Sequence, residues 1–224
     1  MTMWTDLLGS EVRFAGKKFK TRIIEAGSSN SDALILLHGG GGHAETYARN
    51  IACLGESFHA IAIDSIWHGL SSKPEFDDKY VLKFLDQIID LMDDLDIVRA
   101  NFEGLSFGGF LAMLLALNYP DRVRKIVLNT AWGVSFRKGS IMEKPEAHSA
   151  TIERSKNSVL KPDREKVRKR LELLVTDPSQ ITDELVEVRL KIYSMKDTQA
   201  ALIKYYEYLW SDITTPYLLT EEKL

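Results

Sequence analysis

The sequence predicts an α/β protein with a mostly parallel sheet, because strand-like and helix-like segments alternate through its first half. Short apolar runs, such as 33–37 and 58–63, are typical of strands that are covered on both faces. Apolar residues recur at helical spacing over 80–95. A glycine-rich turn joins a strand-like run at 99–103 to an apolar helical run at 110–117. This alternation implies parallel strands joined by crossovers, with helices on both faces of the sheet.

The remaining elements of the first half are weaker signals. Residues 11–26 are predicted to form a hairpin around Ala15-Gly16-Lys17. Residues 44–54 are predicted to be helical, and residues 123–129 to form one more strand. After these, residues 135–212 contain several amphipathic charged segments and no convincing strand.

We therefore expect three parts. Residues 1–134 form the sheet-containing core, 135–212 form a helical lid inserted over it, and 213–224 begin the C-terminal part of the core. In the lid, Thr182 is expected to cap a helix. Most lid charges are interpreted as solvated helix faces.

Composition narrows the class of protein. The 224 residues carry a net charge of −3 without a basic block, which argues against a nucleic-acid partner. The N-terminus does not resemble a signal peptide, and no apolar run approaches bilayer length, so we expect no membrane association. The single cysteine, Cys53, fits a reducing compartment and is expected to be buried. We expect a cytoplasmic protein that acts on a small molecule and possibly forms a homo-oligomer.

The glycine-rich turn carries the strongest chemical signal. Gly104-Leu105-Ser106-Phe107-Gly108 matches Gly-x-Ser-x-Gly, a strand-to-helix elbow that exposes a nucleophilic serine. Glycines at 104 and 108 remove the Cβ atoms that would clash where strand and helix crowd together. A plain strand–glycine–helix turn is the alternative, but the flanking strand and helix favour the elbow.

A nucleophilic serine also requires hydrogen-bond donors for the oxyanion that forms when it attacks a carbonyl. The N–H of Phe107 is one candidate, and Gly40 or its neighbour Gly39 supplies the second from His38-Gly-Gly-Gly-Gly. A phosphate-binding loop is the alternative, but no Gly-Lys-Ser/Thr follows. A dinucleotide site is disfavoured because these glycines follow the third strand rather than the first.

Four motifs together resemble the α/β-hydrolase fold over essentially the whole chain. They are His38-Gly-Gly, Asp64-x-x-x-His68-Gly-x-Ser71, the serine elbow, and Tyr119-Pro-Asp-Arg-Val. Within that fold the chain is most similar to the meta-cleavage product hydrolases, which split carbon–carbon bonds in 2-hydroxy-6-oxohexa-2,4-dienoates. Three further segments carry this resemblance: the glycine loop with Tyr47-Ala-Arg-Asn50, Asn129-Thr-Ala-Trp-Gly133, and Ile181-Thr-Asp-Glu-Leu-x-x-x-Arg189.

The resemblance implies that Ser106 is the catalytic nucleophile and that Asn50 and Arg189 contact the dienoate end of the substrate. An arginine fork and an amide donor suit a carboxylate and a developing enolate. For Arg189 the alternative is a surface cation paired with Glu187 or Glu184, and for Asn50 it is a helix-internal amide bonded to the backbone. The resemblance implies no metal or organic cofactor. The family often carries asparagine where this chain has Leu105.

The acid and histidine of a triad would follow the lid in this fold, in the order serine, aspartate, histidine. The five histidines lie elsewhere: His38, His43, His59, His68 and His148. His43 is expected to cap the following helix, and His68 to shape its loop. We expect the chain to be a fragment of a longer enzyme, with the strand at 123–129 left as an uncovered edge that makes the chain unstable or self-pairing. An ester or lactone hydrolase, and a catalytically silent hydrolase-fold binding protein, remain alternatives.

Overall fold

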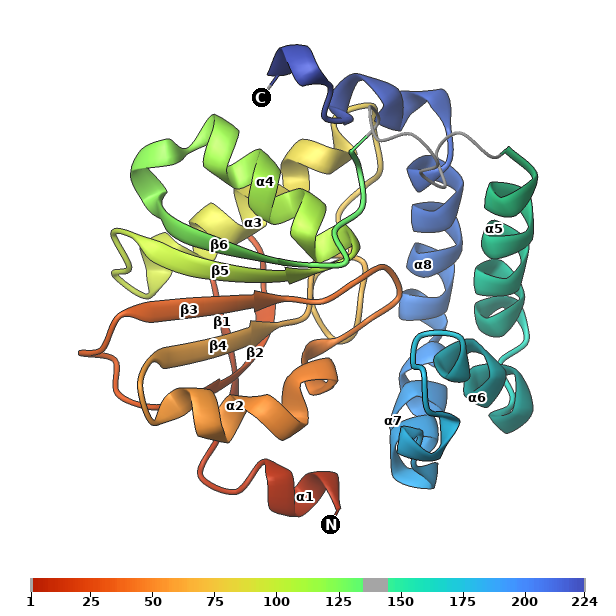
Figure 1. Cartoon of the computed structure of the whole chain (residues 1–224), viewed down its shortest axis with the longest axis horizontal. Coiled ribbons are helices and arrows are strands. Elements are labelled where there is room, and N and C mark those ends of the chain that lie inside the picture. The colour runs from red at the N-terminus through yellow and green to blue at the C-terminus, as the bar shows by residue number, and fades with distance from the viewer. Residues whose placement is uncertain (1, 135–144, 224) are drawn as a thin grey trace. The chain divides into compact units, whose positions relative to one another are not determined.

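The computed structural model describes residues 2–134 and 145–223, with the backbone alone for residues 145–152. These residues form two compact units, Met1–Gly133 and Val134–Leu224 (Figure 1). The first unit contains the sheet, and the second is helical, so each is described separately.

The first unit is built on a six-stranded, mostly parallel sheet, as predicted. Its strands lie in the order β1-β2-β4-β3-β5-β6. Their bounds are β1 Glu11–Ala15, β2 Thr21–Ala26, β3 Ala33–Leu37, β4 His59–Ile63, β5 Ala100–Leu105 and β6 Val123–Asn129. The predicted hairpin is the antiparallel pair of β1 and β2, and β2 also pairs antiparallel with β4. The other four strands are parallel to one another.

Helices cover both faces of this sheet, with α2 on one side and α3 and α4 on the other (Figure 1). The helical elements of the unit are α1 Met3–Asp6, the 3₁₀ turn Ala44–Tyr47, α2 Ala48–Gly55, α3 Tyr80–Asp94, α4 Phe107–Asn118 and the 3₁₀ turn Pro120–Arg122. Every residue of β3 and β4 is buried, which explains their continuous apolar sequences. The buried side chains of α3 follow the predicted apolar stripe.

The strand register brings four loops together at the carboxyl ends of the parallel strands. Leu37, which ends β3, lies opposite Ile63 of β4 and Gly104 of β5. Leu105, which ends β5, lies opposite Asn129 of β6. The loops that follow β3, β4, β5 and β6 therefore emerge together at the carboxyl ends of the parallel strands, where α/β folds place their ligand sites.

The strand β6 is one of the two edge strands of the sheet among the residues that the structure describes, as predicted, and β1 is the other. The side chains of Val127 and Leu128 on this strand are 58% and 44% exposed. An edge strand with exposed apolar side chains offers unpaired backbone groups to another chain.

In its described residues the second unit consists of helices joined by turns and irregular segments, with one isolated parallel bridge between Val134 and Leu219. Its elements are α5 Pro145–Leu160, α6 Arg164–Glu172, the 3₁₀ turn Pro178–Gln180, α7 Asp183–Tyr193, α8 Lys196–Leu209 and the 3₁₀ turns Asp212–Tyr217 and Glu221–Lys223. Thr182 caps α7 as predicted, because its Oγ1 accepts a hydrogen bond from the N–H of Leu185 at 3.2 Å. Residues 135–144 of the expected lid lie outside the described part of the chain.

One expectation about the first unit is wrong. Cys53 is exposed, not buried. It lies on α2, where Ala48 and Ile51 are the buried residues, and its position two residues beyond Ile51 turns it to the opposite face of the helix. In the described residues we find no helix that is both long and apolar enough to span a membrane.

Candidate active site

Ser106 occupies a strained turn between β5 and α4. Its backbone angles are φ 52° and ψ −112°, in a region that costs a residue with a side chain on the order of 1–3 kcal/mol. Two hydrogen bonds fix it there: its N–H donates to the carbonyl of Asn129 at 2.9 Å, and its own carbonyl accepts the N–H of Trp132 at 3.0 Å. Both partners lie at or just beyond the end of β6, so the chain after β6 holds the serine in this conformation.

The two glycines of the motif are required by close backbone approach. A Cβ atom on Gly104 would lie 2.4 Å from the carbonyl oxygen of Gly108. A Cβ atom on Gly108 would lie 2.0 Å from the carbonyl oxygen of Leu37. The helix α4 therefore starts directly against β3 and β5, and the sequence pattern of an elbow corresponds to an elbow in the structure.

We expect Gly108→Ala to destabilise the protein by about 3 kcal/mol or more, because its new methyl group meets backbone that cannot move aside. Gly39→Ala is the matched comparison, since its Cβ would meet nothing closer than 3.3 Å. Urea unfolding of the two variants measures the difference. Equal losses of stability would contradict the close approach at Gly108.

The loop after β3 lies beside the serine. A Cβ atom on Gly39 would come within 3.3 Å of both the Ser106 Cβ and the Leu105 carbonyl oxygen. Phe107 is the first residue of α4, so its N–H belongs to the first turn, which has no intrahelical acceptor. Gly39 and Phe107, both predicted oxyanion donors, thus flank Ser106, and Gly40 follows Gly39 in the same loop. Their role as donors stays a prediction.

The described residues place no general base at Ser106, since no side chain among them hydrogen-bonds to its hydroxyl. His38 accepts the N–H of Ser65 at Nε2, 3.1 Å away, while its Nδ1 lies 2.8 Å from the carbonyl oxygen of Gly39. His59 bonds to Glu25 on the neighbouring strand β2. These two histidines therefore hold the sheet and its loops together.

His68 and His43 also bond to groups other than Ser106. His68 shapes its own loop as predicted, with Nδ1 2.9 Å from the carbonyl oxygen of Ile66. His43 stands at the N-cap position of the 3₁₀ turn Ala44–Tyr47, but its side chain makes no capping bond there. Its Nδ1 instead lies 2.7 Å from Oε2 of Glu45, so the expected cap is wrong. His148 lies on α5 in the second unit.

A buried charge cluster, which the sequence analysis did not find, supports the loops around the site. Arg22 of β2 donates to Oε2 of Glu45 at 3.0 Å and lies 3.3 Å from Oδ2 of Asp64. Asp64, which follows β4, is fully buried, and Arg22 is only 7% exposed. His43 adds a contact to the same glutamate. We call Arg22, His43, Glu45 and Asp64 the buried charge cluster.

This cluster joins the loop after β3 to the loop after β4. Asp64 accepts the N–H of Ala44 at 2.7 Å and that of Leu70 at 2.8 Å. Burial opposes ionisation of Glu45, but hydrogen bonds from His43 and Arg22 outweigh it and hold the pKa of that carboxyl well below its ordinary value. Glu45 therefore stays ionised and holds the glycine loop in place at neutral pH. A basic residue in a buried strand, Arg22, is the one sequence signal that could have pointed to the cluster.

Glu103 is a second partly buried acid, on β5 near Ser106. Burial raises the pKa of its carboxyl, and the nearby Tyr47 hydroxyl and Asn129 amide only partly offset this effect. A carboxyl whose pKa is higher in the folded protein stabilises it below the unfolded pKa, and that stabilisation is lost as pH rises through the folded value. At neutral pH the protein therefore carries the cost of an ionised Glu103.

We expect Glu103→Gln to raise the melting temperature at pH 7.5 and to leave it nearly unchanged at pH 4, because the amide cannot ionise. Thermal unfolding of both proteins across that pH range measures the effect. If the melting temperatures of the two proteins differed by the same amount at every pH, Glu103 would not be the titrating group.

The two predicted substrate contacts lie in different units. Asn50 is on α2 and exposed, and its side chain forms no hydrogen bond to any described residue, so the alternative of an amide bonded to the backbone is wrong. Arg189 is on α7 and only 7% exposed. Its Nη1 donates to the hydroxyl of Tyr193 at 3.3 Å, while Glu187 pairs with Arg164. Arg189 is therefore not a surface cation. Contact of Asn50 and Arg189 with a substrate stays a prediction.

A strained serine at a strand-to-helix elbow, on a mostly parallel sheet with helices on both faces, defines an α/β hydrolase. The family model for the alpha/beta hydrolase fold matches residues 32–158. This match covers more than half of the chain, and the chain belongs to that family.

Similar curated proteins include two hydrolases from Pseudomonas. The chain is 28% identical over 186 residues to 2-hydroxymuconate semialdehyde hydrolase from Pseudomonas sp. strain CF600. It is 27% identical over 190 residues to 2-hydroxy-6-oxo-2,4-heptadienoate hydrolase from Pseudomonas putida. These alignments cover 81% and 84% of this chain but 60% and 64% of the two relatives. The chain thus spans less than two thirds of the length of either relative.

Solved structures of similar enzymes share the fold. The 2-hydroxy-6-oxo-6-phenylhexa-2,4-dienoate hydrolase from Rhodococcus sp. strain RHA1 aligns with a TM-score of 0.81 and 24% identity, covering 96% of this chain and 77% of the other. A meta-cleavage product hydrolase from Pseudomonas fluorescens IP01 aligns with a TM-score of 0.72 and 26% identity, covering 88% and 68%. The predicted resemblance to meta-cleavage product hydrolases is confirmed.

Proposed function

We propose that the protein is a serine-dependent hydrolase that cleaves a carbon–carbon bond in a 2-hydroxy-6-oxo-dienoate, a product of aromatic ring fission. The observation that carries the proposal is the left-handed conformation of Ser106 at the elbow, with Gly39 packed against it. The relatives in Pseudomonas, whose names specify substrates of this class, support the choice of substrate.

The proposed reaction adds one water molecule across the carbon–carbon bond. The guanidinium of Arg189 holds the acidic end of the substrate while the dienol becomes its keto form. Ser106 or water then adds to the distal carbonyl carbon, and the N–H groups of Gly40 and Phe107 bind the oxyanion. Collapse breaks the carbon–carbon bond, and its electron pair takes a proton to give the 2-hydroxydienoate. Where Ser106 has added, water hydrolyses the resulting acyl-serine and restores the hydroxyl, and in either case the distal carbonyl carbon leaves as a carboxylic acid.

The proposal assigns the nucleophile and the oxyanion donors to the first unit, but not the base that takes the serine proton. In the α/β-hydrolase order, an acid and then a histidine follow the serine along the chain. A pH profile of activity that rises through the pKa range of histidine would report this base.

Two alternatives rest on specific observations. An ester or lactone hydrolase would use the same serine and donors, and Leu105 beside Ser106 lacks the polar group that the dienoate enzymes often carry there. A silent hydrolase-fold binding protein is favoured by the lack of any described side chain bonded to the Ser106 hydroxyl.

The test is spectroscopic, because dienoate ring-fission products are yellow. The proposal expects the protein to bleach the dienoate and release one carboxylic acid for each molecule bleached. Turnover of nitrophenyl esters alone would favour the ester hydrolase. No reaction with either substrate, although the dienoate binds, would favour the silent binding protein.

We expect Arg189→Gln to lower kcat/KM for the dienoate by about 100-fold, because a charge-assisted fork to the carboxylate is lost. For a neutral ester the expected change is within about threefold. Tyr193→Phe is the matched control, since it removes the hydrogen-bond partner of Arg189 but leaves the charge. Steady-state kinetics on both substrates measures the effect, and equal losses on both would give Arg189 a structural role only.

A homo-oligomer stays a proposal, supported by the exposed edge strand β6. Cytoplasmic location likewise stays a proposal, supported by the single cysteine.

A further inference from the structure

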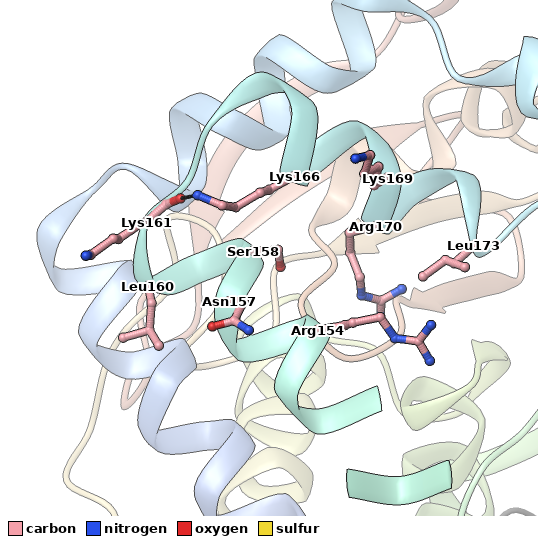
Figure 2. Close-up of a pocket in the computed structure, with 9 residues that line it drawn as sticks. All are labelled: Arg154, Asn157, Ser158, Leu160, Lys161, Lys166, Lys169, Arg170 and Leu173. Atoms are coloured by element: carbon pink, nitrogen blue, oxygen red, sulfur yellow. Dashed lines mark hydrogen bonds between the residues drawn. The ribbon is translucent and has the colours of Figure 1, made fainter. Parts of the chain in front are cut away.

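A hollow of about 600 Å³ lies within the second unit, formed by α5, α6 and the segments that follow each of them (Figure 2). Its volume is in the range of pockets that bind small organic molecules. The residues that line it are Arg154, Asn157, Ser158, Leu160, Lys161, Lys166, Lys169, Arg170 and Leu173. All the described residues that line it belong to the second unit.

Among the described residues, the lining carries five cationic side chains and no carboxylate. Lys166 and Lys169 are partly neutralised, because each lies 2.6 Å from a carboxylate of its own segment, Asp163 and Glu165 respectively. Arg170, by contrast, forms no ion pair with a carboxylate of the described residues, and the same holds for Lys161. Positive charge is therefore concentrated in a concave region, whereas the acids lie outside it.

Two arginines converge from different helices. Arg154 comes from α5 and Arg170 from α6, and Figure 2 shows both guanidinium groups on the same side of the hollow. Two guanidinium groups that face one space can both bond to the same anion. Guanidinium groups also present planar pairs of N–H donors that match the oxygens of a phosphate.

The rest of the lining adds polar and apolar contacts. Ser158 is only 2% exposed and donates to the carbonyl of Ser155 at 2.8 Å, which fixes the wall at that point. Leu160 and Leu173 are 48% and 59% exposed. An anionic group bound by the arginines could thus carry an organic part that packs against exposed leucine side chains.

We propose that this hollow binds a small soluble molecule that carries a phosphate ester or diphosphate group, with Arg154 and Arg170 on either side of that group. A phosphate or diphosphate supplies two or more negative charges and several acceptor oxygens for two guanidinium groups, whereas a monocarboxylate supplies one charge. A solvated helix face explains isolated surface lysines, but it does not explain five cations around one concave space whose described lining residues include no acid. This proposal does not rest on the hydrolase activity proposed for Ser106.

The experiment measures binding of inorganic diphosphate, phosphate and acetate to the whole chain by isothermal titration calorimetry at constant ionic strength. The expected order of affinity is diphosphate, then phosphate, with no saturable binding of acetate. Arg170→Gln and Arg154→Gln should each weaken diphosphate binding by about tenfold or more, because each removes a charge-assisted contact.

Lys191→Gln is the matched control. It removes one positive charge from an exposed position on α7 outside the hollow, and it should change the affinity by less than about twofold. Equal weakening by Lys191→Gln and Arg170→Gln would show a general charge effect and overturn the proposal. The absence of saturable diphosphate binding would also overturn the proposal. So would binding to vesicles that contain phosphatidic acid, measured in the same way, without any binding of free diphosphate. Thermal unfolding of each variant confirms that it is folded before binding is measured.

Discussion

Replacing Ser106 with alanine is expected to lower the rate of dienoate cleavage by about 10³-fold or more, with no loss of folded structure. The hydroxyl makes no hydrogen bond to any described residue, so its removal leaves no partner unsatisfied. The strained backbone at this position is held by main-chain bonds to Asn129 and Trp132, which alanine also makes. The loss is therefore one of chemistry, because the nucleophile is gone. Stopped-flow absorbance of the yellow substrate measures it.

Ser57→Ala is the control for this experiment. Ser57 is exposed, and its side chain makes no hydrogen bond to a described residue. The Ser57→Ala protein should retain full activity. A Ser106→Ala protein with more than a tenth of the original rate would mean that water alone attacks the substrate or that the reaction occurs elsewhere.

The largest effect on stability is expected from Arg22→Met. This change leaves the carboxylates of Glu45 and Asp64 buried without their cation, and breaking a buried pair in this way costs about 3–5 kcal/mol. The loops after β3 and β4 should loosen together, because Asp64 joins them through the N–H groups of Ala44 and Leu70. Denaturant unfolding measures the cost, and amide hydrogen exchange locates it.

Arg124→Met is the matched control on the surface. Arg124 pairs with Asp32 at 2.9 Å, but the two side chains are 47% and 53% exposed. Water and salt screen such a pair, so its loss should cost no more than about 1 kcal/mol. If the two variants lost equal stability, the buried charge cluster would not be what holds the loops.

The order of strands and helices in the first unit followed from the sequence because its signals are local. Continuous apolar runs marked β3 and β4, and the helical stripe over residues 80–95 marked α3. The start of α4 was placed three residues too late, at Phe110 rather than Phe107. The pair Gly108-Gly109 is a poor helix former, and only the tight packing against Leu37 explains its place in the first turn.

The candidate site was only partly predictable. The elbow motif located Ser106 at the turn between β5 and α4, because a short run of sequence determines that turn, while the oxyanion donors stay a prediction. The buried charge cluster depends on Arg22, Glu45 and Asp64, which lie far apart in the sequence and meet only through the sheet order β2-β4-β3. A local sequence pattern does not show which residues from distant parts of the chain come into contact. The prediction that Cys53 is buried was wrong for a related reason, because its burial depends on which face of α2 meets the sheet.

If the strained Ser106 is a nucleophile, a serine-directed fluorophosphonate should modify it, and peptide mass spectrometry locates the adduct. We expect one adduct, on the peptide that contains Ser106, and none after Ser106→Ala. An unmodified Ser106, or an adduct on another serine, would contradict this expectation.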